Sequence, residues 1–365
     1  MSQSRPKMVD VGRLAGVSAQ TVSRYYTGKG YVSAETRARI KSAIAELNYQ
    51  FNGSARNLRV NETRTVGVLI TGPSVYGTWS ILQGLNEAAH DAGYALFSSW
   101  VDFDPADADA PREVHEALDR FLSARVDGIL ISSPHPGIED ALRRVWETVP
   151  VVILSGHAWP SADSATVDSY EAAILATRHL TELGHRRILH IAGPERVNEA
   201  EDRERGYHDA LAEVSAAPLP ILRGDWSAQS GFDAGSGVEL GAFSAVFSGN
   251  DQMALGFMNA LRRRGLVAPA DYSIAGVDDM PDARHFAPPL TTVWMDFVEL
   301  GRAGFRMLVE RIATGERVAR HVIRPRLVVR ESTARVTTRP IRAGEISGRR
   351  HAGSGRSAGR KPWTG

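Results

Sequence analysis

The run Leu14–Arg24, LAGVSAQTVSR, constrains the fold of the N-terminal part more strongly than any other stretch. Val11, Leu14 and Ala15 recur at helical spacing, and a glycine follows them at the point where a first helix would end. Ser18 is then placed to N-cap a second helix that continues through Arg24. The sequence therefore predicts a helix, a tight glycine-containing turn and a second helix.

The predicted second helix carries small or hydrogen-bonding side chains that suit the reading of base edges: Ala19, Gln20, Thr21, Ser23 and Arg24. A third helix is expected after Ser33, because Ile40, Ile44 and Leu47 recur at helical spacing and can close a small core. An ordinary helical hairpin is the alternative. Residues 1–59 contain ten lysines and arginines against three acidic residues, and this positive charge favours a DNA-binding module.

Together with VSAETRARIKSAIAELNY (Val32–Tyr49), this stretch resembles the DNA-binding head of the lactose repressor family of bacterial transcription regulators. The resemblance implies that Ala19, Gln20 and Arg24 contact base edges. It further implies that Ser18, Thr21, Ser23 and Asn52 chiefly contact the DNA backbone. Tyr31 is a further DNA-binding residue that the resemblance implies.

Residues 50–62 join the head to the rest of the chain. By resemblance they form a hinge helix that pairs across a dimer and is ordered only on DNA, with Ala55 and Leu58 at the minor groove. Phe51 stands where the family usually has a proline, and Gly53 lies inside the segment. Because glycine weakens helices, a plain flexible linker is the alternative.

The near-neutral net charge of +1 over 365 residues hides a partition. Residues 60–336 contain 26 basic and 38 acidic side chains, so attraction for DNA is confined to the head. There is no cysteine, no secretory signal pattern and no long apolar run, which predicts a cytoplasmic protein, nucleoid-associated when bound to DNA, with no membrane partner. No HExxH, GxSxG or GxxxxGK[ST] motif occurs, so we expect no enzyme, no cofactor and no metal site.

Beyond residue 62, short apolar runs alternate with amphipathic helical ones. The expected strands are Thr65–Thr71, Tyr94–Trp100, Asp127–Ser132, Pro150–Ser155, Arg187–Ala192, Ser244–Ser248 and Tyr272–Asp278. This alternation predicts parallel sheets covered by helices on both faces, divided between two lobes. Polar residues just past the strand ends mark where a site would form, among them Thr71 and Ser133.

Several motifs in this part also resemble the same family: LTELGHRRI (Leu180–Ile188), GDWSAQSGF (Gly224–Phe232), NDQMALG (Asn250–Gly256), VDD (Val277–Asp279) and PPLTTV (Pro288–Val293). The resemblance implies an all-α head followed by a periplasmic-binding-protein-like α/β body. It places the domains at 1–49, 50–62, 63–336 and 337–365, the last being a Gly/Arg/Ser-rich tail expected to be disordered. Three crossings between the lobes are expected at Ser155–Thr166, Pro288–Met295 and Arg320–Arg326.

A sugar presents several hydroxyls and an apolar ring face, so its site needs polar side chains and a flat aromatic one. The resemblance assigns Arg203, Asn250 and Asp278 to hydroxyls and Trp226 to the ring. The other implied effector residues are Val75, Tyr76, Ile81, Ser132, Ser155 and Phe297. The alternatives are a turn cap for Asp278, a helix cap for Asn250, a surface position for Arg203 and plain core for Trp226.

Three positions depart from the family pattern: Ser155 replaces an aspartate, Val167 an aromatic residue and Met295 a glutamine. These changes bear on which ligand fits. The resemblance implies a homodimeric repressor that a small sugar, galactoside-like or a related mono- or disaccharide, releases from a pseudo-palindromic operator. The tail lacks a leucine heptad, which favours a dimer. A purine-type corepressor and a transport-type sugar receptor are the alternatives.

Overall fold

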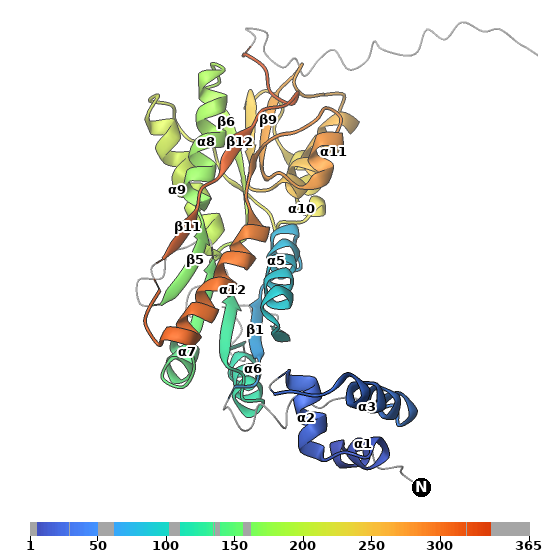
Figure 1. The fold of residues 1–365 in the computed structure, drawn as a ribbon. Coiled ribbons are helices and arrows are strands. Elements are labelled where there is room, and N and C mark those ends of the chain that lie inside the picture. Colours follow the sequence, from blue (N-terminus) through green and yellow to red (C-terminus); the bar gives the residue numbers. More distant parts are fainter. Residues whose placement is uncertain are drawn as a thin grey trace, which may run out of the picture. The chain divides into compact units, whose positions relative to one another are not determined.

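The computed structural model describes residues 6–28, 30–49, 62–101, 110–133, 135, 139–155, 162–318 and 320–336. It divides into two compact units, Met1–Arg64 and Thr65–Gly365, drawn in Figure 1. Asn52, Ala55 and Leu58 lie outside the described residues, as does the tail at 337–365.

The first unit consists of α1 (Met8–Ala15), α2 (Ala19–Thr27) and α3 (Ala34–Glu46). Ser18 Oγ accepts a hydrogen bond from the Thr21 amide at 3.1 Å and thereby caps α2. Val11, Val22 and Ile40 form the fully buried centre of this unit. Each helix thus contributes at least one apolar side chain to a small shared core, as the helix-turn-helix pattern predicts.

Leu14 departs from that prediction, because it is 45% exposed. The buried stripe of α1 runs through Val11, Gly12 and Ala15, the side that packs against α2 and α3. A side chain at Gly12 would come within 2.8 Å of the Val17 carbonyl oxygen. The close approach of the turn therefore selects the buried side of α1 and leaves Leu14 outside the core.

The first lobe of the second unit is a parallel sheet in the order β11-β5-β4-β3-β1-β2. Its strands are β1 (Thr65–Thr71), β2 (Ala95–Val101), β3 (Gly128–Ser132), β4 (Val151–Ser155), β5 (Asp163–Val167) and β11 (His321–Ile323). Val68 and Ile70 face the core shared with α5 (Tyr76–Ala92) and α12 (Phe297–Thr314). Leu69 points to the opposite face, toward α6 (Ala110–Ser123) and α7 (Glu139–Trp146).

The second lobe repeats this plan in the order β12-β10-β9-β8-β6-β7, with β12 antiparallel to β10. Its strands are β6 (Ile188–Ala192), β7 (Leu222–Arg223), β8 (Ala245–Ser248), β9 (Ser273–Asp278), β10 (Thr291–Trp294) and β12 (Arg326–Val328). The helices α8 (Ser169–Glu182) and α9 (Asn198–Ala212) pack together, as do α10 (Ala228–Gly237) and α11 (Asp251–Arg263). The predicted two-lobed body, with helices on both faces of parallel sheets, is confirmed (Figure 1).

The chain passes between the two sheets after β5, between β10 and α12, and between β11 and β12. The third crossing lies within the predicted Arg320–Arg326. The second prediction, Pro288–Met295, reaches the crossing only at its last residue, because Thr291–Trp294 form β10 in the second-lobe sheet. The first prediction, Ser155–Thr166, is wrong, because both of these residues lie in strands of the first-lobe sheet. Ser155 is paired with Thr166 in the register of β4 and β5, so the chain leaves only after Val167. The sequence analysis did not predict β5, because its sequence, DSATV, has no long apolar run.

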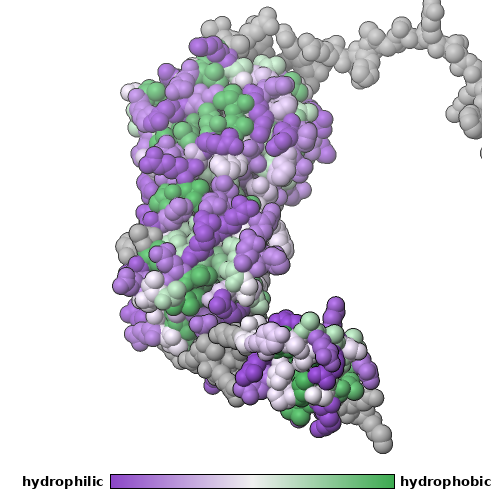
Figure 2. Space-filling model, viewed as in Figure 1, coloured by the Kyte–Doolittle hydropathy of each residue, from purple (hydrophilic) through white to green (hydrophobic). Residues whose placement is uncertain are grey.

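The face of the second unit seen in Figure 2 is mostly hydrophilic, with smaller hydrophobic patches between polar ones. The apolar side chains of the sheets are largely buried. Among the described helices, none combines the length and the hydropathy of a membrane span.

Candidate effector and DNA-binding sites

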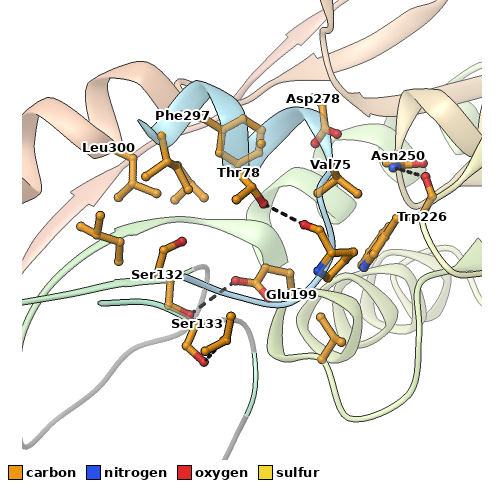
Figure 3. A pocket seen from close by; sticks show the side chains of 18 of the residues that line it. Val75, Thr78, Ser132, Ser133, Glu199, Trp226, Asn250, Asp278, Phe297 and Leu300 are labelled. Atoms are coloured by element: carbon orange, nitrogen blue, oxygen red, sulfur yellow. Dashed lines mark hydrogen bonds between the residues drawn. The ribbon is translucent and has the colours of Figure 1, made fainter. Parts of the chain in front are cut away.

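A cleft lies between the two lobes of the second unit, at the carboxyl ends of the parallel strands. It encloses about 700 Å³ of empty space, part of it open to solvent. Ser132 and Ser155, at the ends of β3 and β4, approach it from the first lobe, together with Phe297 and Leu300 of α12. Figure 3 shows Glu199, Trp226, Asn250 and Asp278 of the second lobe around the same space.

All the effector residues predicted from the sequence except Tyr76 line this cleft: Val75, Ile81, Ser132, Ser155, Arg203, Trp226, Asn250, Asp278 and Phe297. Tyr76 instead lies behind the wall, its ring edge-on to Phe297 with the centroids 6.3 Å apart. The fold therefore brings together residues that are more than two hundred positions apart in the sequence.

Arg203 and Asp278 form the charged centre of the cleft. Arg203, on α9, is 4% exposed, so the surface alternative for this residue is wrong. Its Nη2 lies 3.8 Å from Asp278 Oδ1, and its Nη1 donates to the Gly249 carbonyl oxygen at 2.5 Å. Burial raises the pKa of Asp278 to about 7, although the positive charge of Arg203 acts in the opposite direction.

Trp226 is both packed and part of the cleft wall. Its side chain is largely covered, the residue being 6% exposed, and the Arg203 guanidinium carbon lies 5.2 Å from the ring centroid. Gly193 is required beside it, because a side chain there would overlap the indole. Trp226 also has a left-handed backbone conformation with φ of 72°. Trp226 is therefore a packed core residue, as its alternative predicts, and at the same time a lining residue of the cleft.

Asn250 caps α11, which confirms the helix-cap alternative given for this residue. Its Oδ1 accepts from the Met253 amide at 2.8 Å, and its Nδ2 donates to the Trp226 carbonyl oxygen at 2.9 Å (Figure 3). An amide has two donor hydrogens and an oxygen with two lone pairs, so these bonds leave capacity for a ligand. The same bonds fix the position of Trp226 relative to α11.

A buried carboxyl group supports the loop that follows β9. Asp251 is fully buried, and it accepts from Thr292 Oγ1 at 2.6 Å and from the Met280 amide at 3.0 Å. Burial raises the pKa of Asp251, and the nearby charge of Asp278 raises it further. Asp279 pairs with Arg330 Nη2 at 2.5 Å. These contacts fix the backbone that follows Asp278.

Some lining residues were not singled out as effector contacts. Thr71 and Ser133, joined by a hydrogen bond of 2.8 Å, lie at strand ends, a place the sequence marked only in general terms. Glu199 was missed altogether, because it lies in the first turn of α9 rather than at the end of a strand. The remaining ones are Pro73, Gly77, Thr78, Leu154, Val167, Val197 and Leu300.

In the first unit, α2 presents the residues predicted to meet DNA. Gln20 and Arg24 are exposed, whereas Ala19, Thr21 and Ser23 are half-buried around the buried Val22. Ser18 Oγ lies 2.9 Å from Thr21 Oγ1, so these hydroxyls support each other. Tyr31 is 90% exposed. An exposed polar face on the second helix of this motif is the arrangement that base reading requires.

Comparison with known proteins identifies the family. Residues 7–52 match the model described as bacterial regulatory proteins, lacI family, and residues 177–333 match a periplasmic binding protein-like domain. The chain is 32% identical over 335 residues to the HTH-type transcriptional repressor PurR of Haemophilus influenzae, covering 88% of this chain and 97% of that protein. The chain belongs to the lacI family.

Solved structures of lacI-family proteins agree with this fold. A lac repressor dimer bound to operator and the anti-inducer ONPF has a TM-score of 0.81 and 30% identity, covering 91% of this chain and all of that one (100%). The regulator CelR in complex with cellobiose has a TM-score of 0.64 and 29% identity, covering 90% of this chain and 100% of that one. The lacI-family protein described here is a DNA-binding transcriptional repressor.

Proposed function

We propose that this repressor binds a small sugar in the cleft between its lobes and that the sugar releases it from its operator. The observation that carries the proposal is the indole of Trp226 beside the Arg203–Asp278 pair in one cleft. An aromatic surface next to paired donors and acceptors suits a ring that bears hydroxyl groups. The CelR structure, described as a cellobiose complex, supports this ligand class.

We infer that DNA is bound by the first unit, through Ser18, Ala19, Gln20, Thr21, Ser23, Arg24 and Tyr31, with Asn52, Ala55 and Leu58 of the hinge. Two heads would occupy successive major-groove half-sites of a pseudo-palindromic operator.

The proposed division is 1–49 for the head, 50–62 for the hinge, 63–336 for the effector and dimerisation domain and 337–365 for the tail. A ligand acts on such a protein only through its different affinities for the two states of the cleft.

A second copy of this chain is the partner that we propose for an exposed aromatic patch on the first lobe. Trp79 on α5 is 57% exposed, and Phe97 and Trp100 on β2 are each 38% exposed. The rings of Trp79 and Trp100 lie 5.5 Å apart. Neighbouring exposed aromatic rings are typical of protein interfaces. The similarity to a lac repressor dimer supports a homodimer.

The proposal is tested by screening the purified protein against mono- and disaccharides for an increase in melting temperature. A sugar that raises it should also weaken operator binding. The Asp278→Ala variant should still bind operator but no longer respond to that sugar. A complete absence of sugar binding would contradict the proposal, and a normal response of the variant would remove Asp278 from the site.

A purine corepressor is the second candidate, and the observation that favours it is the similarity to repressors named PurR. The two candidates differ in sign, because a corepressor strengthens operator binding whereas an inducer weakens it. The same screen should therefore include purine bases and nucleosides, followed by an operator titration. A transport-type receptor would not need the helix-turn-helix head that this chain carries.

A further inference from the structure

The charged side chains that line the described part of the cleft are Glu199, Arg203 and Asp278. The cation among them is already engaged: Arg203 lies 3.8 Å from Asp278, donates to the Gly249 carbonyl and covers the ring of Trp226. Glu199 adds a second carboxyl group to the same space. The lining therefore offers a ligand more acceptor capacity than positive charge.

Glu199 reaches the cleft from α9, in the second lobe. Its Oε1 accepts a hydrogen bond of 3.4 Å from the hydroxyl of Ser155, which ends β4 in the first lobe. Figure 3 shows the Glu199 carboxyl group directed toward the side of the cleft that carries Ser132 and Ser133. A ligand that fills the space between the lobes must therefore pass close to this carboxyl group.

We propose that Glu199 is a specificity-determining residue that restricts the cleft to ligands with hydrogen-bond donors and no negative charge. This inference rests on the proposed function and names its ligand class: uncharged sugars and amino sugars, to the exclusion of sugar phosphates and sugar acids. A hydroxyl or ammonium group donates to the carboxylate, whereas a phosphate loses its hydration beside a like charge. Discrimination of this kind comes from repulsion of the wrong ligand.

The test compares matched probes by calorimetric titration of the full chain. The probes are cellobiose and the glucose and galactose series, each series as the neutral sugar, the 2-amino sugar, the 6-phosphate and the uronic acid. We expect a neutral or amino member to bind and its anionic counterparts to bind at least about tenfold more weakly. Glu199→Gln should reduce this difference, because glutamine keeps the shape and removes the charge.

Glu201→Gln is the matched control, since Glu201 lies in the same turn of α9 but is exposed and does not line the cleft. It should leave the difference unchanged. Wild-type protein that binds a phosphate or uronate as tightly as the neutral sugar overturns the inference but leaves the proposed function standing. A folded Glu199→Gln variant that keeps the same difference in affinity between neutral and anionic probes also overturns the inference and leaves the proposed function standing. If that variant does not fold, the wild-type ranking decides. If no probe binds, the proposed function fails and this inference fails with it.

Discussion

Arg203 Nη2 lies 3.8 Å from Asp278 Oδ1, and both side chains are shielded from solvent between the lobes. The pair joins the middle of α9 to the end of β9. Burial nevertheless raises the pKa of Asp278 from 3.8 to about 7, so its carboxyl group is partly protonated at neutral pH. The positive charge of Arg203 thus offsets only part of the cost of desolvation.

Stability should consequently depend on pH through Asp278. The folded protein holds this proton more tightly than the unfolded chain, so the contribution is complete below the unfolded pKa of 3.8 and is lost as pH rises through about 7. We expect the free energy of unfolding of the wild type, relative to Asp278→Asn, to fall between about pH 4 and about pH 7, by at most about 1.4 kcal/mol per pH unit. Urea unfolding of both proteins measures it, and a constant difference would contradict the raised pKa.

Arg24→Ala should weaken binding to the cognate operator by about 10- to 100-fold while nonspecific binding changes far less, because a base contact is worth about 1–3 kcal/mol. Sugar binding should be unaffected. Lys41→Ala is the control, since Lys41 is exposed on α3 and we expect it to meet only phosphates. It should weaken specific and random duplexes alike in a fluorescence titration. Unchanged selectivity in Arg24→Ala would remove this residue from base reading.

Gly84→Ala should destabilise the first lobe by about 1–3 kcal/mol, because its side chain would overlap the Val298 carbonyl oxygen where α5 crosses α12. Separating these helices also shifts Ile81 and Phe297, so ligand affinity should fall together with stability. Gly237→Ala is the control, since nothing lies within 4 Å of a side chain there. Denaturant unfolding of both variants distinguishes the two sites, and equal stability would show that the crossing adapts without cost.

Trp79→Glu should convert the proposed dimer to a monomer, because it places a charge in the aromatic patch formed by Trp79, Phe97 and Trp100. Sedimentation velocity at micromolar concentration measures the change. Val267→Glu, at a residue that is 45% exposed and outside the patch, should remain dimeric. A dimeric Trp79→Glu protein would direct the search for the interface to another face.

The sequence predicted the elements whose signal is local. The strands β1 and β4 match the predicted apolar runs to within one residue. Ser18 caps α2 as expected. By contrast, β5, β11 and β12 are short and have no such run, so they are defined by pairing with distant strands. Their positions therefore become visible only in the folded chain.

The candidate site divides in the same way. Asp278 ends the apolar strand β9 and Asn250 follows β8, so their place at one edge of a sheet can be inferred from the sequence alone. Glu199 has no such marker, and only the folded body brings it to Ser155. Leu14 shows the opposite error, since its spacing is right for a core position but the turn that follows α1 packs against Gly12, on another side of the helix.

The helix α12 begins with Phe297 and Leu300 in the wall of the cleft. Near its other end, Arg311 Nε lies 3.6 Å from Asp163 Oδ2, at the edge of the sheet where β1 also begins. Its 18 residues form a rod about 27 Å long with no proline to bend it. A ligand that displaced Phe297 would therefore also shift the distant end of this helix, beside the amino-terminal ends of the first-lobe strands.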